Sequence, residues 1–332
     1  MTINEVDLKQ FRSSVVSDGD SNGGRLSTVE VNSGISSNLF SPADTDAQAA
    51  GFQSYRKTFL ANHGTTKAFD AKAYIEKPTA GGDEIMFFAG TQTDTQGGIT
   101  GSEALFGCGN LNADATSLDT LLLVDVHDWA NAPIFRNSVL LRVSDKTDIK
   151  GAGNTEFVSV HSSTPITAVG NLVTIPLATP LVGNYAAAST RVSAVYEHGD
   201  MGATADAFAL TTASGTYDGG TYPLVTNNKG SIEQIWTLTF DDASNFTVSG
   251  DTLGSIGSGS IGADFSPTNP DYTEPYFTLD RLGFGGTWAG GETLVFPTHP
   301  SAMPLWAFRD GPAGISPEAG NSAVLALLVG GE

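Results

Sequence analysis

The sequence predicts a mainly β protein: antiparallel strands in a sandwich or barrel-like arrangement, with long loops and an extended N-terminal arm. Three observations support this fold class. Short runs of alternating apolar and polar residues recur along the chain, bounded by Gly, Pro, Asn or Asp. The composition includes 39 glycines and 15 prolines, which favours many turns. Apolar residues make up 40% of the 332 residues, which excludes a wholly disordered chain.

Residues 232–306 form the densest aromatic and β-branched stretch, and we interpret it as the element around which the chain is organised. Five large side chains share one parity in two alternating runs: Trp236, Leu238, Phe240, Phe246 and Val248. Because successive side chains of a strand point to opposite faces, these five can lie on one buried face. The polar residues 241–245 between the runs suit a hairpin loop. We therefore predict an antiparallel hairpin as the folding core.

Shorter strands are predicted elsewhere. Alternation places Ala73 and Ile75 on one face of a strand. Further strands are predicted at residues 84–89, 121–126, 138–143, 156–160, 172–177 and 323–329. The last of these has edges free to pair across a subunit boundary. A short helix is predicted within residues 43–60, and we interpret the basic pair Arg56-Lys57 as a solvated strand edge.

The predicted organisation has three parts: an N-terminal arm (1–50), a first β region (51–188) and a second β region (189–332) with the core hairpin. The two β regions also fit one continuous domain. A compact fold of 34.4 kDa would have a surface of about 13,000 Å². Residues 1–40 have little periodicity and a glycine-rich centre, so we expect them to be mobile alone and ordered against a neighbouring subunit.

A formal charge of −20, from 36 acidic and 16 basic residues, constrains the partners of the chain. Such a charge repels phosphate, so we expect no binding of DNA through a basic surface and no sequence-specific nucleic-acid partner. No apolar run approaches about twenty residues, which predicts no membrane span. The N-terminus lacks a basic region followed by an apolar one, so we expect no secretory signal and synthesis in the cytoplasm.

Candidate catalytic and metal-binding residues are scattered. The single cysteine, Cys108, excludes an internal disulfide and a multi-cysteine zinc site, and we interpret it as a buried thiol. The five histidines are His63, His127, His161, His198 and His299. Two of them have carboxylates close in sequence: Asp125 and Asp128 beside His127, and Glu197 and Asp200 beside His198. On a strand Asp125 and His127 would share a face, but no known catalytic or metal-binding frame contains either cluster. We therefore favour loop histidines with satisfied hydrogen bonds.

Residues 18–23 match the opening of a calcium loop through Asp18, Asp20 and Asn22. Val29 stands where that loop needs a bidentate Glu, so we interpret the segment as a turn.

The glycine cluster 283–286 resembles half of a nucleotide loop, but it lacks the following Lys and a helix pattern. A bulge or close strand packing is the better interpretation. Three tryptophans would suit a sugar-binding platform, but core packing is favoured: Trp236, Trp288 and Trp306. We predict no catalytic, cofactor-binding or metal-binding residue, and no cofactor.

Several short motifs resemble structural proteins encoded by tailed bacteriophages. Near the N-terminus they are Asn22-Gly23-Gly24-Arg25, residues 33–35, residues 38–40 and Tyr55-Arg56-Lys57. Further along they are residues 196–200, 232–240, 264–267 and 283–288, while about 95–185 is less distinctive. The resemblance implies a role in particle assembly, in the head–tail junction or tail, and it carries over no catalytic residue.

We therefore expect a non-enzymatic structural subunit of a tailed-phage virion, made in the host cytoplasm, that self-assembles in the neck or tail. Its expected partners are copies of itself, in a ring or stacked homo-oligomer, and other virion proteins. An acidic ring would let DNA slide through a lumen, which favours the neck or tail. The alternatives are a capsid decoration or stabilising protein, and a receptor- or carbohydrate-binding virion module. A hydrolase with paired carboxylates or a His–Asp site is the alternative of another class.

Overall fold

The computed structural model describes residues 3–35, 37–148, 150–316, 318 and 321–330. The protein is mainly β, with 46% strand and 5% helix in several antiparallel sheets, which confirms the predicted fold class. No sheet in the described ranges closes into a barrel, so the sandwich alternative holds. None of the helices found there is long and apolar enough to cross a membrane.

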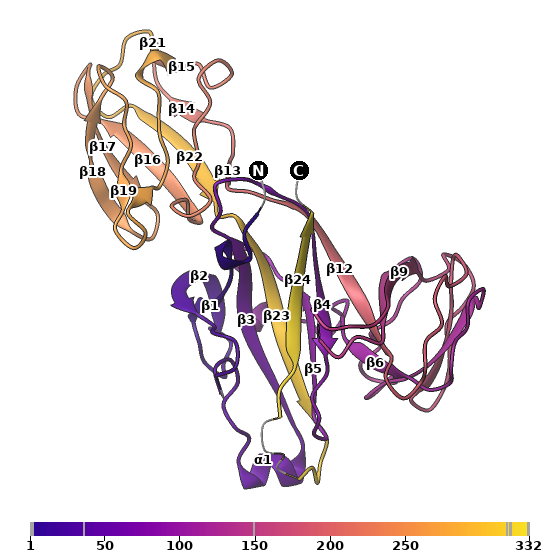
Figure 1. Ribbon diagram of the computed structural model, residues 1–332. Helices are drawn as coiled ribbons and strands as arrows, with labels where there is room; N and C mark the ends of the chain where they lie inside the picture. Colours follow the sequence, from indigo (N-terminus) through magenta and orange to yellow (C-terminus); the bar gives the residue numbers. More distant parts are fainter. Residues whose placement is uncertain (1–2, 36, 149, 317, 319–320, 331–332) are drawn as a thin grey trace.

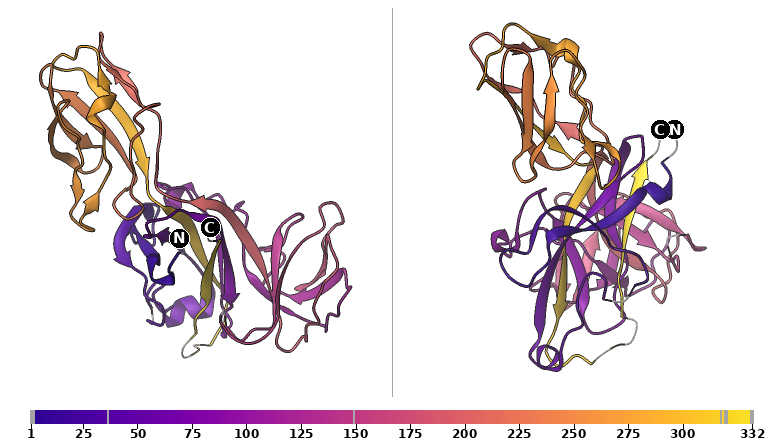
Figure 2. Two further views of the ribbon diagram at one scale, coloured as in Figure 1. Left: turned by 45° about the horizontal axis from the view of Figure 1, so that its top comes forward. Right: turned by 90° about the vertical axis from the view of Figure 1, so that its left-hand side faces the viewer.

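Three lobes make up the molecule (Figures 1 and 2). We call them the base (the described residues of 3–106, 194–201 and 301–330), the side lobe (107–193) and the upper lobe (202–300). The base takes strands from both ends of the chain, because β23 pairs with β3 and β24 pairs with β4. The side and upper lobes are therefore insertions into one β unit. This differs from the predicted succession of an arm and two β regions.

The base is built from two facing sheets. The first has the order β2 (Gly23–Glu30), β1 (Leu8–Val15), β3 (Phe52–Asn62), β23 (Ala302–Gly311) and β5 (Glu84–Ala89). In the second, β4 (Ala68–Lys77) lies between β24 (Val324–Gly330) and the end of β12 (Arg191–Met201). The predicted face of β4, with Ala73 and Ile75, is buried in one apolar core with side chains of the first sheet. Short helices complete the base: η1 (Glu5–Asp7), α1 (Thr45–Ala50) and η2 (Gln96–Gly98).

The side lobe continues the second sheet. Its strands are β6 (Cys108–Leu111), β7 (Leu121–Asp125), β8 (Leu140–Ser144), β9 (Thr155–Ser159), β10 (Thr167–Val169) and β11 (Leu172–Pro176). Residues 191–195 of β12 pair with β8 in this lobe, and residues 196–201 of the same strand pair with β4 in the base. The apolar core also runs from one lobe into the other. The predicted strands at β5, β7, β8, β9, β11 and β24 are confirmed to within two residues at each end.

The upper lobe has its own sheet and its own core. The sheet contains β13 (Thr204–Ala205), β14 (Ala209–Thr211), β16 (Gln234–Phe240), β17 (Asn245–Gly250), β18 (Gly254–Ser260) and β22 (Thr293–His299). Two short ladders and a 3-10 turn surround it: β15 (Thr216–Tyr217) with β21 (Phe284–Gly285), β19 (Thr268–Asn269) with β20 (Glu274–Pro275), and η3 (Arg281–Gly283). Its buried cluster is rich in aromatic rings and separate from the core of the base.

The predicted hairpin is formed by β16 and β17, with Phe240 opposite Phe246. All five side chains of the predicted face are buried to 1% exposure or less. The hairpin organises the upper lobe and not the whole chain, so that part of the prediction is wrong. Aromatic density along a sequence reports a local core, whereas the base is assembled from residues at both ends of the chain.

The N-terminal segment is more ordered than its composition indicates. Strands β1 and β2 lie in the first sheet, and Phe11 of β1 pairs with Phe59 of β3, where both rings are buried. Its order therefore comes from the same chain, which corrects the expectation of an arm that orders against a neighbour. The predicted short helix is α1, capped by the Asp44 carboxylate, which accepts a hydrogen bond from Ala47 N at 2.8 Å.

Direct contacts fix the upper lobe to the base. The Arg25 guanidinium of β2 forms a bidentate pair with Asp251, at 2.5 and 3.0 Å. Asn228 Nδ2 donates to Gly64 O at 2.9 Å. The accessible surface of the molecule is 15,221 Å², which exceeds the about 13,000 Å² of a compact protein of this mass. The excess follows from the three projecting lobes (Figure 2).

Candidate functional site

Two of the motifs named in the sequence, residues 22–25 and 55–57, meet inside the base. The Lys57 side chain is fully buried, and its Nζ lies 2.6 Å from Asp94 Oδ1. The same ammonium donates to Gly24 O at 2.6 Å. Trp306 Nε1 donates to the other oxygen of Asp94 at 2.8 Å. We call Gly24, Lys57, Asp94 and Trp306 the Lys57 cluster.

The glycines of the first motif have a steric role in this cluster. Gly23 has φ +112°, and a Cβ there would lie 2.8 Å from the Trp306 ring and from Asp94 O. No other residue fits so close an approach. Asn22 is fully buried, and its Nδ2 donates to Tyr55 O and to Gln96 Oε1, both at 2.9 Å. This amide is committed to the fold, so the segment is a turn rather than a calcium loop.

The basic pair Arg56-Lys57 is buried to 6% and 1% exposure, so the prediction of a solvated strand edge is wrong. Strand β3 is the central strand of its sheet, with β1 on one side and β23 on the other. Burial lowers the pKa of Lys57, and the Asp94 carboxylate opposes that shift. The sequence around Lys57 does not contain Asp94, so it cannot show that a carboxylate compensates for the burial of the ammonium.

Replacing Asp94 with Ala is expected to destabilise the base by about 2–3 kcal/mol, because the Lys57 ammonium would keep backbone carbonyls alone as partners. Urea melts measure the loss. The matched control is Asp46→Ala, which removes an exposed carboxylate from α1. Equal, small losses in the two variants would show that the cluster contributes little.

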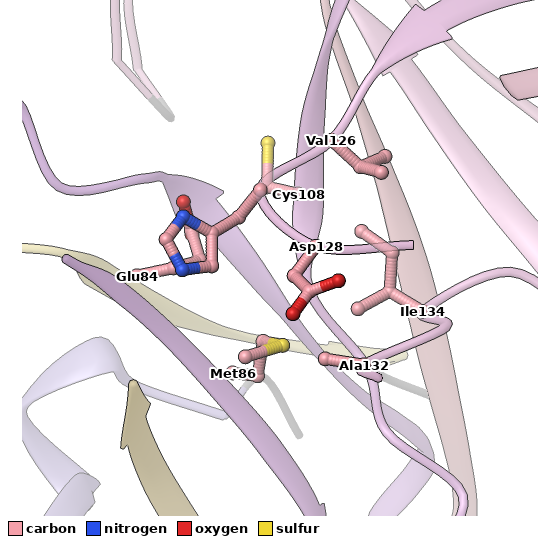
Figure 3. Close-up of a pocket in the computed structure, with 8 residues that line it drawn as sticks. Glu84, Met86, Cys108, Val126, Asp128, Ala132 and Ile134 are labelled. Atoms are coloured by element: carbon pink, nitrogen blue, oxygen red, sulfur yellow. The ribbon is translucent and has the colours of Figure 1, made fainter. Parts of the chain in front are cut away.

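A second cluster lies where the side lobe meets the base (Figure 3). His127, just after β7, has its Nε2 3.2 Å from Asp310 Oδ2 of β23. Glu84 of β5 faces the same cavity, and its Oε1 is buried without a hydrogen-bond partner among the described residues. Cys108 and Asp128 also line this cavity. At about 10 Å³ it holds one water molecule at most, which excludes a substrate.

The protonation of this second cluster follows from burial. Desolvation raises the pKa of Glu84 to about 8 and that of the Cys108 thiol to about 12. The prediction of a buried thiol at Cys108 is confirmed, and the thiol stays protonated at neutral pH. The hydrogen bond to Asp310 raises the pKa of His127. The cluster therefore links the side lobe to the base, and the raised pKa values of Glu84 and Cys108 favour their protonated forms.

Replacing Glu84 with Gln is expected to remove a pH dependence of stability. The folded-state pKa of about 8 lies above the ordinary 4.5, so the contribution of Glu84 is full below pH 4.5 and lost as pH rises to about 8. Glu84→Gln should nearly match the wild type at pH 5 and exceed it by roughly 2–3 kcal/mol at pH 9 in urea melts.

The charged groups near Glu84 set the control for this experiment. Asp83 favours the neutral carboxyl, and His127 opposes it. The raised pKa of His127 adds stability below pH 6.5 that is lost above its folded pKa, so some slope remains in the variant. An exposed control, Glu197→Gln, should follow the wild-type profile. Parallel profiles for Glu84→Gln and the wild type would contradict this account.

The five histidines lie in five different surroundings. Two of them make packing or weak polar contacts: His63 packs against Phe11 and Tyr272, and His198 lies near Tyr196 Oη. His161 accepts a hydrogen bond from Ser163 N. The other two face carboxylates: His127 pairs with Asp310, and His299 lies between Glu233 and Asp206. Asp125 accepts from Asn112 at 2.6 Å instead of meeting His127, and Asp200 pairs with Lys67 rather than His198. Asp128 lines the same cavity as His127, but neither carboxylate–histidine cluster of the sequence is complete. In the described ranges no three His, Cys, Asp or Glu residues are grouped as a metal site requires.

The glycine cluster and the tryptophans serve packing. Gly286 has φ +68°, and a Cβ there would lie 2.0 Å from Ser214 O, which confirms close packing of that loop. The three tryptophans are exposed by 2% or less, so none forms a sugar platform. An open hollow of about 450 Å³ lies elsewhere in the upper lobe, lined by Asp206, Phe208, Leu210, Tyr217, Pro223 and Leu224, among others. The sequence analysis did not predict this hollow or the buried position of Glu84. The signal for Glu84 is a single carboxylate at the start of an otherwise apolar strand.

No known family, curated protein or solved structure matches this chain. The described residues form a buried polar cluster that fixes the base, a buried cluster between the base and the side lobe, and an open hollow in the upper lobe. The first two stabilise a shape, and the hollow is large enough for a small ligand.

Proposed function

We propose that this chain is a non-enzymatic structural subunit of a tailed-phage virion that self-assembles in the neck or tail and contacts other virion proteins. One observation carries the proposal: three β lobes are joined into one body by a shared strand and by lobe-to-lobe contacts. Strand β12 belongs to the side lobe and to the base, and Arg25 ties the base to the upper lobe. A repeated building block needs this combination of stiffness and large surface.

The Lys57 cluster supports the proposal from the sequence side. Residues 22–25 and 55–57, two motifs shared in style with phage structural proteins, contact each other in the base. The residues that carry the resemblance to phage structural proteins therefore include residues that pack the base. The charge of −20 favours the neck or tail, since an acidic lumen does not hold DNA. Capsid decoration is the alternative position.

Two measurements test the proposal. Mass photometry of the purified full chain should give an oligomer of defined mass. Electron microscopy of intact particles, with an antibody against the upper lobe, should place the chain at the neck or tail. Label over the capsid surface would favour decoration. A chain that is absent from purified particles and present in the lysate would overturn the proposal.

The hollow of the upper lobe favours a second candidate, a receptor- or carbohydrate-binding virion module. The ring centroids of Phe208 and Tyr217 lie 4.5 Å apart at this hollow, which Asp206 also lines. Aromatic rings with a nearby carboxylate can bind sugars by stacking and hydrogen bonding. A glycan array should detect binding that Phe208→Ala abolishes and that Phe157→Ala, an exposed aromatic of the side lobe, leaves intact. No binding by the wild type would remove this candidate.

A further inference from the structure

Strand β24 is an open edge of the second sheet. It pairs with β4 on one side, and no other described element reaches its backbone with a hydrogen bond. Residues 321–330 contain no charged residue and no proline. Val324 and Leu328 are 43% and 39% exposed on the outer face. The ladder between β24 and β4 has register irregularities next to Val324 and after Leu328, and it is regular between them. Natural proteins guard an open edge with charges, proline or bulges, so an uncharged edge with a regular central stretch indicates a strand partner.

The other sheet edges of the described chain are guarded or short. Strand β2 carries Arg25 and Glu30, and Phe87 of β5 exchanges two backbone hydrogen bonds with Phe106, which cover part of that edge. Strand β10 has three residues. Strand β18 is glycine-rich, and its register with β17 shifts next to Gly257, which has φ +133°. Strand β9, which pairs with β8 alone, carries Glu156. β24 differs from these edges because it is seven residues long, uncharged and not glycine-rich.

The lack of charge on β24 allows a second copy of this chain as the partner. Each copy has a formal charge of −20, so two copies repel wherever acidic surfaces meet. A contact along the uncharged residues 321–330 avoids bringing carboxylates together at its centre.

The sequence of β24 is also compatible with pairing to the same strand of a second copy. A two-fold axis perpendicular to the sheet keeps each side chain on its own face, and full overlap of the seven residues places Leu327 opposite Leu327. On the outer face this register sets Val324 opposite Gly330 and Ala326 opposite Leu328, a large side chain against a small one each time. On the core face Leu325 meets Val329, and both already pack against the core.

A neighbouring register fits less well. With Ala326 opposite Ala326, Val324 would face Leu328, two large outer side chains, and the last two residues of the strand would have no partner. Registers offset by an odd number would turn core-facing side chains outward.

We propose that two copies of this chain join through β24, antiparallel about Leu327, so that one sheet runs across both. The inference rests on the self-assembly in the proposed function and names its surface. Seven paired residues make a small contact. Association of the free chain is therefore weak and becomes strong where contacts repeat in a particle.

A single cysteine tests the register. Leu327→Cys should give a disulfide-linked dimer under mild oxidation, because directly opposite residues of antiparallel strands have Cα atoms about 4.5–5.5 Å apart. The native Cys108 is buried and does not compete. The matched control is Leu325→Cys, half-buried on the same face. Its two copies would lie roughly 14 Å apart along the strand and should stay unlinked.

An association measurement tests the surface with a second pair of variants. Leu328→Asp should weaken dimerisation in sedimentation equilibrium by about tenfold or more, because it adds a carboxylate to the uncharged contact. Leu123→Asp is the control, with 36% exposure on β7, a strand paired on both sides. Thermal melts confirm that each variant folds.

The outcomes separate the two proposals. Cross-linking of Leu327→Cys but not Leu325→Cys, with weaker association of Leu328→Asp, supports the β24 contact. Oligomers that neither Leu328→Asp nor Leu123→Asp weakens would overturn that contact and leave self-assembly standing. A wild-type chain that stays monomeric at every concentration and salt would overturn both.

Discussion

Replacing Trp236 with Ala is expected to lower the free energy of unfolding of the upper lobe by about 3–5 kcal/mol. The ring is fully buried on β16, packs against Tyr276 and Phe277 at centroid distances of 5.2 and 5.1 Å, and donates from Nε1 to Thr298 Oγ1 at 2.8 Å. Truncation would leave a large cavity and an unpaired hydroxyl acceptor. Because the core of this lobe is separate, the loss should fall on one transition of a urea melt and spare the base.

The matched control is Thr237→Ser, on the opposite face of the same strand. This change removes one methyl group from a half-buried side chain, and we expect it to cost less than about 1 kcal/mol. Equal losses in the two variants would mean that the buried face is misassigned. A Trp236→Ala loss spread over both transitions would mean that the lobes unfold together.

Local patterns predicted the strands well because they need no knowledge of distant residues. The parity of Trp236, Leu238 and Phe240 alone fixes which face of β16 is buried. The short runs bounded by turn residues locate β7 and β11 in the same way. Such patterns say nothing of which strands become neighbours, so the insertion of two lobes into one base was out of reach.

The polar contacts that hold the lobes together were equally out of reach. His127 meets Asp310 across 183 residues of chain, and its sequence neighbour Asp125 points elsewhere. Lys57 is acceptable in a buried strand because Asp94 arrives from a loop of the base. In both places the sequence shows one charged side chain, and only the fold supplies its partner.

The second large effect is expected at the buried pair between Arg142 of β8 and Glu76 of β4. Each side chain is 2% exposed, with Nη1 2.7 Å from Oε2 and Nη2 3.1 Å from Oε1. The guanidinium also lies 5.0 Å from the Tyr74 ring centroid, and Arg191 lies 4.0 Å from Glu76. Arg142→Met should cost about 3–5 kcal/mol at neutral pH, because a buried carboxylate loses its main partner.

The pH dependence of this loss gives its cause. Burial raises the pKa of Glu76, and Arg142 opposes that shift, so its removal raises the folded-state pKa further. A raised carboxyl pKa gives stability that is full below the unfolded value and is lost as pH rises through the folded one. Urea melts of Arg142→Met should therefore show a loss that is small at low pH and grows toward neutral pH.

A double variant decides whether the ion pair between Arg142 and Glu76 adds to the stability of the contact between side lobe and base, or only selects which strands lie side by side there. Arg142→Met with Glu76→Leu removes both charges and keeps apolar volume between β8 and β4. Buried ion pairs replaced in this way are often as stable as before or more stable, because no desolvation cost remains. We expect the double variant to recover most of the stability that Arg142→Met loses, with no dependence on pH from this site. If the double variant is as unstable as the single one, the ion pair itself supplies the stability of the joint between side lobe and base.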